Sequence, residues 1–293
     1  MSATAPSVAP GRADAGAIDR RGIGLLATGH FVIDATVGAV PAMIPVFTAI
    51  YALSDLAASM ILGASLLVSS AIQPVFGILA DRRATTVFLW GGVAVAATGL
   101  ALSGLAGGYA GVLACIVGSG LGIAAFHPEA ARVANRLSAD RTATGLAWFM
   151  LGGNAGFAAG PLLAALFIPV LDARATLVFL VPGLVVAVWL HHERQRLAIP
   201  VVARPAPAGA ARPAAARAGG WAIGLLLVVT SMRTWTQFCV LALAPLLLTD
   251  QRGFSDQAAG FAVVAFSAAG AAGRHNQFAQ FLINDRGFFM HTS

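Results

Sequence analysis

The chain has 293 residues, of which 58% are hydrophobic and only 10% are charged, and its formal net charge is +6. About a quarter of the residues of a typical soluble domain are charged. This composition therefore excludes an ordinary soluble domain, a disordered chain and a small disulfide-rich module. The few basic residues lie between apolar runs rather than in one basic domain, which argues against a nucleic-acid partner. We expect a protein whose solvent is a lipid bilayer.

Long apolar runs follow one another along the chain. The hydrocarbon core of a bilayer is about 30 Å thick and is crossed by roughly 20 residues of helix. The runs therefore predict an all-α membrane protein with about eight transmembrane helices. They lie at residues 23–44, 56–80, 86–105, 109–126, 144–171, 176–190, 221–248 and 258–273.

The positions of the arginines predict the orientation of these helices, because cytoplasmic loops carry an excess of basic residues. With a cytoplasmic N-terminus, only Arg174 and Arg252 lie in outer loops. Thirteen arginines then face the cytoplasm: Arg12, Arg20, Arg21, Arg82, Arg83, Arg132, Arg136, Arg141, Arg194, Arg196, Arg204, Arg212 and Arg217. The sequence therefore predicts a multi-pass protein with its N-terminus in the cytoplasm.

Residues 191–220 differ from every other loop, since they contain four prolines and five arginines. Such a segment is typical of an extended, solvated linker. It separates a predicted six-helix bundle at 22–190, preceded by a cytoplasmic tail at 1–21, from two further helices at 221–273. Two membrane halves joined in this way are typical of transporters. Residues 274–293 contain a single alanine and four of the 17 phenylalanines, and we interpret them as an aberrant tail.

The first predicted helix carries His30 and Asp34, four residues apart and therefore on one helix face. An ionisable group at bilayer depth costs roughly 2.5–3.5 kcal/mol on insertion scales, which makes it a functional candidate. Since histidine titrates near neutral pH, the two residues are candidates for proton coupling. The alternative is a pair that serves stability alone.

The segment after the fourth predicted helix reads FHPEAAR and supplies His127, Glu129 and Arg132. Pro128 suits the first turn of a short cytoplasmic helix. The alternative is that the fourth helix continues past Phe126 and carries these three side chains to the mouth of a cavity. In that second case they are candidates for substrate binding.

Three further polar residues lie within apolar runs. Arg233 is an arginine well inside the seventh predicted helix, where it suits an anionic substrate or pairs with Asp34. Gln237 lies one turn further along, and Asn154 lies among glycines in the fifth helix. We take all three as candidates for substrate binding.

Two motifs concern the packing of the helices. Gly77, Asp81 and Arg82 lie in the stretch GILADRR, at the end of the second predicted helix and in the loop after it. This stretch resembles the loop signature of the major facilitator superfamily and implies a cytoplasmic gate. Gly152, Gly156 and Gly160 precede Pro161 at intervals of four, so they share one helix face on which backbones can touch. The stretch GFAAGP resembles a glycine-proline motif of drug/proton antiporters.

Taken together, GHFVIDATVGAVPAMIP, GILADRR, FHPEAAR and GGNAGFAAGP resemble the fosmidomycin-resistance branch of the major facilitator superfamily, from about Gly22 to Gly273. The resemblance implies an exporter of the bacterial inner membrane that is driven by protons. Its substrates are small, anionic molecules such as phosphonate antibiotics, and it needs no cofactor or metal. That branch has twelve helices, so we expect a chain truncated near Gly273.

The sequence also bears on three other functions. An uptake symporter for small organic anions has the same helices and the same charged groups. A membrane fragment without transport activity is compatible with the tail at 274–293. An intramembrane enzyme is not supported, because the sequence lacks HExxH, GxSxG and GxGxxG. We therefore expect a transporter and not an enzyme.

Overall fold

The structure, a computed structural model, describes residues 17–82 and 86–198 without interruption. Beyond them it describes residues 221, 224–225, 228–229, 232, 236, 239–240, 244, 247–254, 262 and 265–266. The chain divides into two compact units, Met1–Pro200 with Gln277–Ser293, and Val201–Asn276. In the second unit the structure describes scattered helical positions and a π-helical turn, η3 (Leu247–Gln251). Every regular element in the described residues is helical, which confirms the predicted all-α fold.

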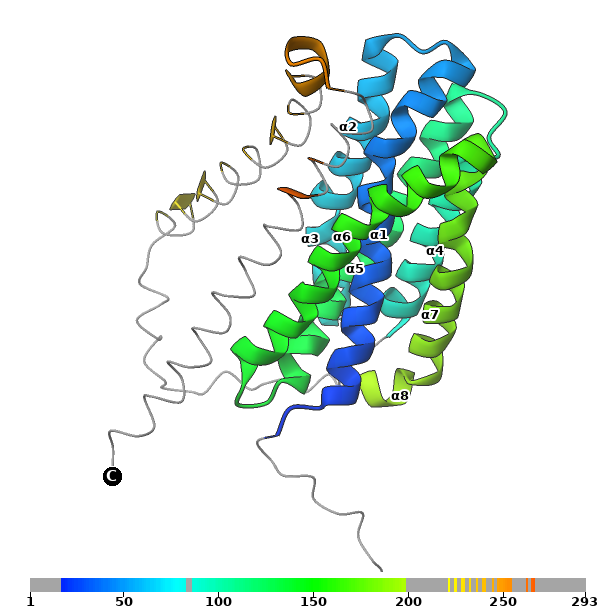
Figure 1. Cartoon of the computed structure of the whole chain (residues 1–293). Helices are drawn as coiled ribbons and strands as arrows, with labels where there is room; N and C mark the ends of the chain where they lie inside the picture. Colours follow the sequence, from blue (N-terminus) through cyan, green and yellow to red (C-terminus); the bar gives the residue numbers. More distant parts are fainter. Residues whose placement is uncertain are drawn as a thin grey trace, which may run out of the picture. The chain divides into compact units, whose positions relative to one another are not determined.

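The first unit is a bundle of helices that run alternately up and down (Figure 1). A helical pair, α2 and α3, makes the second pass, and the short 3₁₀ helix η1 leads into α7 for the last. The elements are α1 (Arg20–Tyr51), α2 (Asp55–Ala71), α3 (Gln73–Arg82), α4 (Val87–Ser103), α5 (Tyr109–Leu137), α6 (Thr142–Leu171), η1 (Asp172–Phe179), α7 (Leu180–His192) and α8 (Arg194–Leu197).

Most of these elements are long and apolar enough to cross a membrane. The segments Arg20–Tyr51, Asp55–Asp81 and Tyr109–Leu137 meet that condition, and so does the continuous helical stretch Thr142–His192. The chain reverses inside this last stretch at Asp172, whose φ of 54° ends α6. Helix α4 is apolar but has 17 residues, about 26 Å of helix at 1.5 Å per residue.

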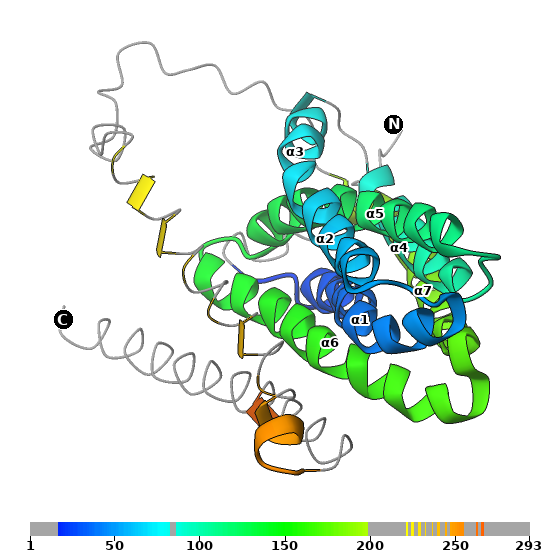
Figure 2. The ribbon, with the colours of Figure 1, turned by 90° about the horizontal axis from the view of Figure 1, so that it is seen from above.

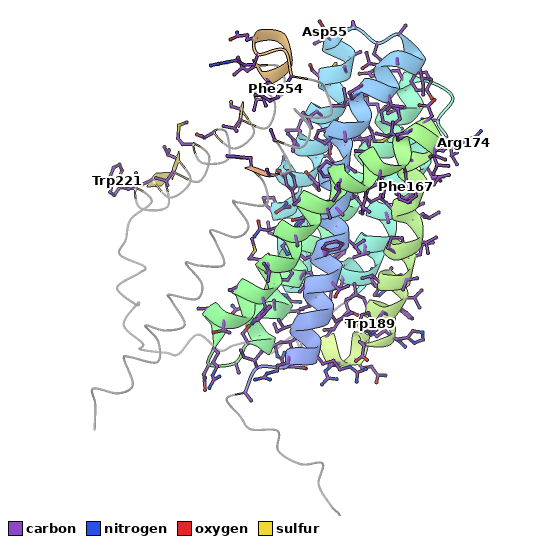
Figure 3. The ribbon with its side chains drawn as sticks, in the orientation of Figure 1. Asp55, Phe167, Arg174, Trp189, Trp221 and Phe254 are labelled. Atoms are coloured by element: carbon purple, nitrogen blue, oxygen red, sulfur yellow. The ribbon has the colours of Figure 1, made fainter. Side chains whose placement is uncertain are left out.

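Helix α1 lies at the centre of the bundle and contacts α2, α4, α5, α6 and α7 (Figure 2). It begins at Asp19, whose side chain accepts a hydrogen bond from the Gly22 N–H at 3.0 Å and so caps the helix. It ends at Ala52, which takes up a left-handed conformation with φ 48°. In Figure 3, Asp55 and Arg174 mark the end of the bundle where α1 stops, and Trp189 lies toward the end where α1 begins.

Helix α6 packs on α1 along the three glycines at intervals of four. A Cβ atom on Gly152, Gly156 or Gly160 would collide with a backbone carbonyl oxygen of α1, within the stretch Ala27–Ala35. The two backbones therefore approach each other without side chains between them, as small-residue seams allow in membrane helices. The seam fixes the height of α6 relative to the polar residues of α1.

The apolar core of the bundle has two parts that meet halfway along α1. One cluster includes Ile33 and extends toward the start of α1, and the other includes Ala35 and extends toward its end. Asp34 lies between these two residues in the sequence. The polar residues of α1 therefore lie where the two hydrophobic clusters meet, far from either end of the helix.

The structure decides between the two alternatives for FHPEAAR and corrects one expectation about a loop. The fourth helix does not end at Phe126, because α5 continues through Pro128 to Leu137. The continuing helix, and not a separate cytoplasmic one, therefore carries FHPEAAR. The expected loop containing Gly77, Asp81 and Arg82 is also helical, because the second pass is broken earlier, at Ile72, and resumes as α3 up to Arg82. A proline at position 74, in the first turn of α3, is well suited to restart a helix there.

Candidate functional site

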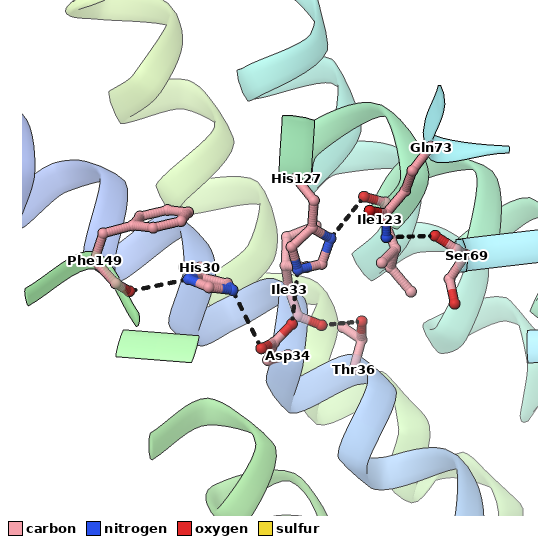
Figure 4. Close-up of polar contacts among 9 residues, drawn as sticks. All are labelled: His30, Ile33, Asp34, Thr36, Ser69, Gln73, Ile123, His127 and Phe149. Carbon is pink, nitrogen blue, oxygen red and sulfur yellow. Dashed lines mark hydrogen bonds and ion pairs between the residues drawn. The ribbon is translucent and has the colours of Figure 1, made fainter. Parts of the chain in front are cut away.

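His30 and Asp34 of α1 face each other within the bundle (Figure 4). His30 Nε2 lies 3.3 Å from Asp34 Oδ2, as the spacing of four residues allows. The other ring nitrogen of His30, Nδ1, lies 2.9 Å from the carbonyl oxygen of Phe149 on α6. His30 is almost completely buried, so these two contacts are its polar environment.

A third ionisable side chain, His127 of α5, joins this pair. Its Nε2 lies 3.1 Å from Asp34 Oδ1, the carboxylate oxygen that His30 does not contact. Its Nδ1 lies 3.0 Å from the carbonyl oxygen of Ile123, one turn earlier on α5. We call His30, Asp34 and His127 the His–Asp–His cluster. It joins α1 to α5 through the two oxygens of one carboxylate.

Aromatic rings and a glycine enclose the cluster. The His30 ring stacks on Phe149 with ring centroids 4.2 Å apart, and it meets the His127 ring edge to face at 5.1 Å. On the α6 side, Gly153 leaves the space that His30 and Asp34 occupy, since a Cβ atom there would overlap both side chains. Sequence reasoning did not single out Gly153, although the adjacent pair Gly152 and Gly153 was visible.

The donor set of the cluster is also one that metal ions use. Within the described residues, His30, Asp34 and His127 form the group whose ligand atoms all lie within 4.8 Å of one another. However, each imidazole contacts the carboxylate directly at a hydrogen-bonding distance. These contacts account for the geometry of the three side chains without an ion.

Glu129 and Arg132 form a separate pair further along α5. Arg132 donates two hydrogen bonds to the two oxygens of Glu129, Nε to Oε2 at 3.0 Å and a terminal nitrogen to Oε1 at 2.8 Å. Glu129 is buried, with 1% of its surface exposed, whereas about a quarter of the Arg132 side chain is exposed. The pair therefore satisfies the carboxylate internally and leaves part of the Arg132 side chain exposed.

The remaining candidates are distributed as follows. Asn154 lies on α6 next to Gly153 and is half-buried. On α3, Gly77 lies beside Pro128 of α5, since a Cβ atom added to Gly77 would stand 3.8 Å from the Pro128 Cβ. Asp81, also on α3, is exposed. Arg233 and Gln237 lie outside the described residues. Within the described part of the chain, the two histidines are the ionisable groups that contact the Asp34 carboxylate.

Ion pairs close the end of the bundle where α1 begins. Arg196 of α8 donates to Asp19 Oδ2 at 2.8 Å, and Arg21 pairs with Glu193. Burial of Asp19 opposes its ionisation. The hydrogen bonds from Arg196 and from the Gly22 N–H outweigh burial and lower the pKa of the Asp19 carboxyl. These contacts connect the first and the last helical pass of the first unit.

The sequence signals for this site were incomplete. The spacing of His30 and Asp34 was readable along one helix, but their partner on α5 is 93 residues from Asp34. No local pattern connects residues so far apart, which is why His127 was grouped with the substrate candidates. An ionisable residue in a second apolar helix was the only signal available.

Comparison with known proteins identifies the family. A family model described as Major Facilitator Superfamily matches residues 26–289. The fosmidomycin resistance protein of Escherichia coli (strain K12) is 34% identical over 146 residues, which is 50% of this chain and 36% of that protein. The uncharacterized MFS-type transporter YfnC of Bacillus subtilis (strain 168) is 31% identical over 139 residues, 47% of this chain and 34% of that protein. The matches thus cover about a third of the length of these relatives. The chain is a multi-pass membrane protein that belongs to the Major Facilitator Superfamily, a family of transporters of small molecules.

Proposed function

We propose that the protein is a proton-coupled efflux transporter that exchanges protons for small, anionic molecules such as fosmidomycin-like phosphonates. The His–Asp–His cluster carries the proposal. It places one carboxylate and two imidazoles inside the bundle, in a part of the chain that is otherwise apolar. Ionisable groups at such a depth mark proton and substrate pathways in membrane transporters.

The choice of substrate class draws on charge and on one relative. The Escherichia coli relative is named for resistance to fosmidomycin. In this chain, about a quarter of the Arg132 side chain is exposed and Arg233 lies in an apolar run, and both arginines suit an anion. We propose Gln237, Asn154, His127 and Glu129 as further contributors to the substrate path, with His127 shared between substrate and proton.

Other parts of the chain take their proposed roles from this function. Gly77, Asp81 and Arg82, in the last turns of α3, form a cytoplasmic gate together with α5, on which α3 packs. Residues 191–220 link the six-helix bundle at 22–190 to the helices at 221–273. The thirteen arginines named above orient the protein in the bacterial inner membrane with the N-terminus in the cytoplasm.

Transport into inverted membrane vesicles tests the function. Vesicles from cells that produce the chain are supplied with fosmidomycin, and the lumen is acidified. An antiporter accumulates the drug when the lumen is acidic, whereas an uptake symporter does so only with an acidic exterior. Drug accumulation that does not depend on the proton gradient would contradict the proposal.

Asp34→Asn is the matched variant. The amide has almost the same shape as the carboxylate but carries no charge, so it stabilises a protonated imidazole much less than the carboxylate does. We expect Asp34→Asn to lose gradient-driven accumulation completely while it reaches the membrane in normal amounts. Full accumulation with normal pH dependence in this variant would remove Asp34 from the mechanism.

A further inference from the structure

In both imidazoles of the His–Asp–His cluster, the neighbouring groups determine which ring nitrogen carries the hydrogen. Nδ1 of His30 contacts the carbonyl oxygen of Phe149, and Nδ1 of His127 contacts the carbonyl oxygen of Ile123. A carbonyl oxygen only accepts hydrogen bonds. Both Nδ1 atoms must therefore carry a hydrogen whatever the charge of the ring. Two backbone carbonyls thus fix the tautomer of both histidines.

This assignment decides what faces Asp34. In a neutral ring whose Nδ1 carries the hydrogen, Nε2 has a lone pair and no hydrogen. Both Nε2 atoms point at Asp34, one at each carboxylate oxygen, at 3.3 and 3.1 Å. With both rings neutral and the carboxylate ionised, two lone pairs face two negatively charged oxygens, which is repulsive. Each proton that binds to an Nε2 turns one of these contacts into a charge-assisted hydrogen bond.

We infer that His127 is a second proton-binding residue of this site, and that the loaded cluster holds two protons, one on Nε2 of each histidine, against the two oxygens of Asp34. This inference rests on the proposed proton coupling and extends it from the α1 pair to α5. The step is a simple proton transfer. A proton from water binds to Nε2 on loading and returns to water on release, with no other bond made or broken.

The exposure of the three groups gives an order to this exchange. Side-chain exposure is 23% for His127 and 20% for Asp34 but only 3% for His30. His30 is therefore the most enclosed of the three side chains, and in our proposal a proton reaches it through His127 and Asp34. His127 is the entry residue of the cluster, and His30 is the inner one.

Few other charges act on the cluster. Helices α4 and α6, which pack on α1, contain no ionisable side chain. Helix α5 adds Glu129 and Arg132, which neutralise each other, and Arg136 in its last turn. Helix α3 adds Asp81 near Glu129, and the end of α7 adds His191 and His192. Within the described residues, Asp34 is thus the charged group in direct contact with the two imidazoles.

Proton loading also has a mechanical consequence. The contact between His127 and Asp34 joins α5 to α1, and with an ionised Asp34 it is attractive when His127 carries the second proton. Release of that proton makes the contact repulsive and weakens the attachment of α5 to α1 at this depth. A transporter needs such a link between proton binding and helix position, because a ligand shifts a conformational equilibrium only through differential interaction with its states.

Histidine-selective NMR of the full chain tests the inference without any substrate. The chain has six histidines, and ¹⁵N labelling of their rings distinguishes Nδ1–H, Nε2–H and doubly protonated forms. The protein is placed in bilayers of Escherichia coli lipids, and the pH is lowered from about 8 to about 5, the range in which histidine titrates. The loss of one signal set in His30→Gln and in His127→Gln assigns the two rings.

We expect both rings to be Nδ1–H tautomers when neutral and both to become doubly protonated as the pH falls. In His127→Gln the side-chain amide can still donate to Asp34 but cannot bind a proton, so one protonation step remains. In Asp34→Asn both rings should stay neutral at a pH that loads the wild type. A neutral His127 in the Nε2–H form, or a His127 that stays neutral while His30 titrates, overturns the inference.

These outcomes are independent of transport. If both rings titrate as expected but vesicles show no gradient-driven export, the proposed function is wrong and the two-proton cluster stands. If Asp34→Asn abolishes export while His127 never binds a proton, the proposed function stands and the second proton is wrong.

Discussion

Gly153 of α6 lies directly against His30 of α1, so that a Cβ atom on Gly153 would stand 2.5 Å from Cε1 of the imidazole. The same Cβ would stand 2.7 Å from Oδ2 of Asp34. Because the neighbouring seam holds α6 against α1, neither helix can move away to make room. The geometry of the His–Asp–His cluster thus depends on a missing side chain in a helix that contributes no charge to it.

Gly153→Ala should therefore displace His30 from Asp34. Overpacking of a well-packed interior costs about 1–3 kcal/mol, and we expect a lower melting temperature together with loss of proton-driven transport. Gly118→Ala on α5 is the control, because its Cβ meets no atom within 4 Å. Differential scanning fluorimetry in detergent and the vesicle assay measure the two effects. Equal behaviour of the two variants would show that Gly153 does not hold the cluster open.

The seam between α1 and α6 predicts a second effect of added methyl groups. In Gly156→Ala the new Cβ would collide with the carbonyl oxygen of Phe31, which is backbone and cannot rotate away. We expect a destabilisation of about 1–3 kcal/mol, read from unfolding in a denaturing detergent. Gly24→Ala on α1 adds a methyl group where nothing lies within 4 Å, and it should be neutral or slightly stabilising. A seam variant as stable as Gly24→Ala would contradict the close approach of the two backbones.

The hydrogen bonds between Glu129 and Arg132 predict that substitutions of these two residues have non-additive effects on stability. Arg132→Ala leaves the buried Glu129 carboxylate without its two hydrogen bonds, whereas Glu129→Gln together with Arg132→Ala removes the charge as well. A buried polar group left unsatisfied costs about 1–3 kcal/mol, so the single variant should be less stable than the double variant. Melting temperatures of both proteins and of Glu129→Gln complete the cycle. A double variant less stable than Arg132→Ala would count against an internal role for the pair.

The ion pair between Asp19 and Arg196, at the end of the bundle where α1 begins, predicts that the stability of the fold depends on pH in the acid range. Because the pKa of Asp19 is lowered in the folded protein, its pairing with Arg196 stabilises the fold above the ordinary pKa of aspartate. That stability is lost as the pH falls below 3.8 and through the lowered value. The effect should be small and should shrink with added salt, since both side chains are partly exposed.

Asp19→Asn isolates this contribution, since asparagine still caps a helix but does not titrate. We expect the variant to melt at a lower temperature than the wild type near neutral pH and to lose less stability on acidification. The difference between the two melting temperatures should vanish once Asp19 is protonated. A constant difference across the whole acid range would assign the effect to capping instead.

The sequence by itself determined the features that repeat along one helix. Apolar runs about 20 residues long predicted the membrane-crossing elements, because the thickness of the bilayer sets a length that composition reveals. The interval of four placed Gly152, Gly156 and Gly160 on one face of a helix, and the same interval placed His30 next to Asp34 on one face of another. These are local consequences of helix geometry, and the structure has the glycines against α1 and the two side chains in contact.

Only the tertiary structure decided which helices meet. In the structure α5 continues through Pro128, a point that the sequence left open. His127 therefore lies beside Oδ1 of Asp34, the oxygen that His30 does not contact. The tertiary structure also gave Gly153, which no charge or motif marks, the position that leaves room for His30. Contacts between helices depend on the rotation and the height of each helix in the bundle. Packing between backbones sets both quantities, and no periodicity within a single helix encodes them.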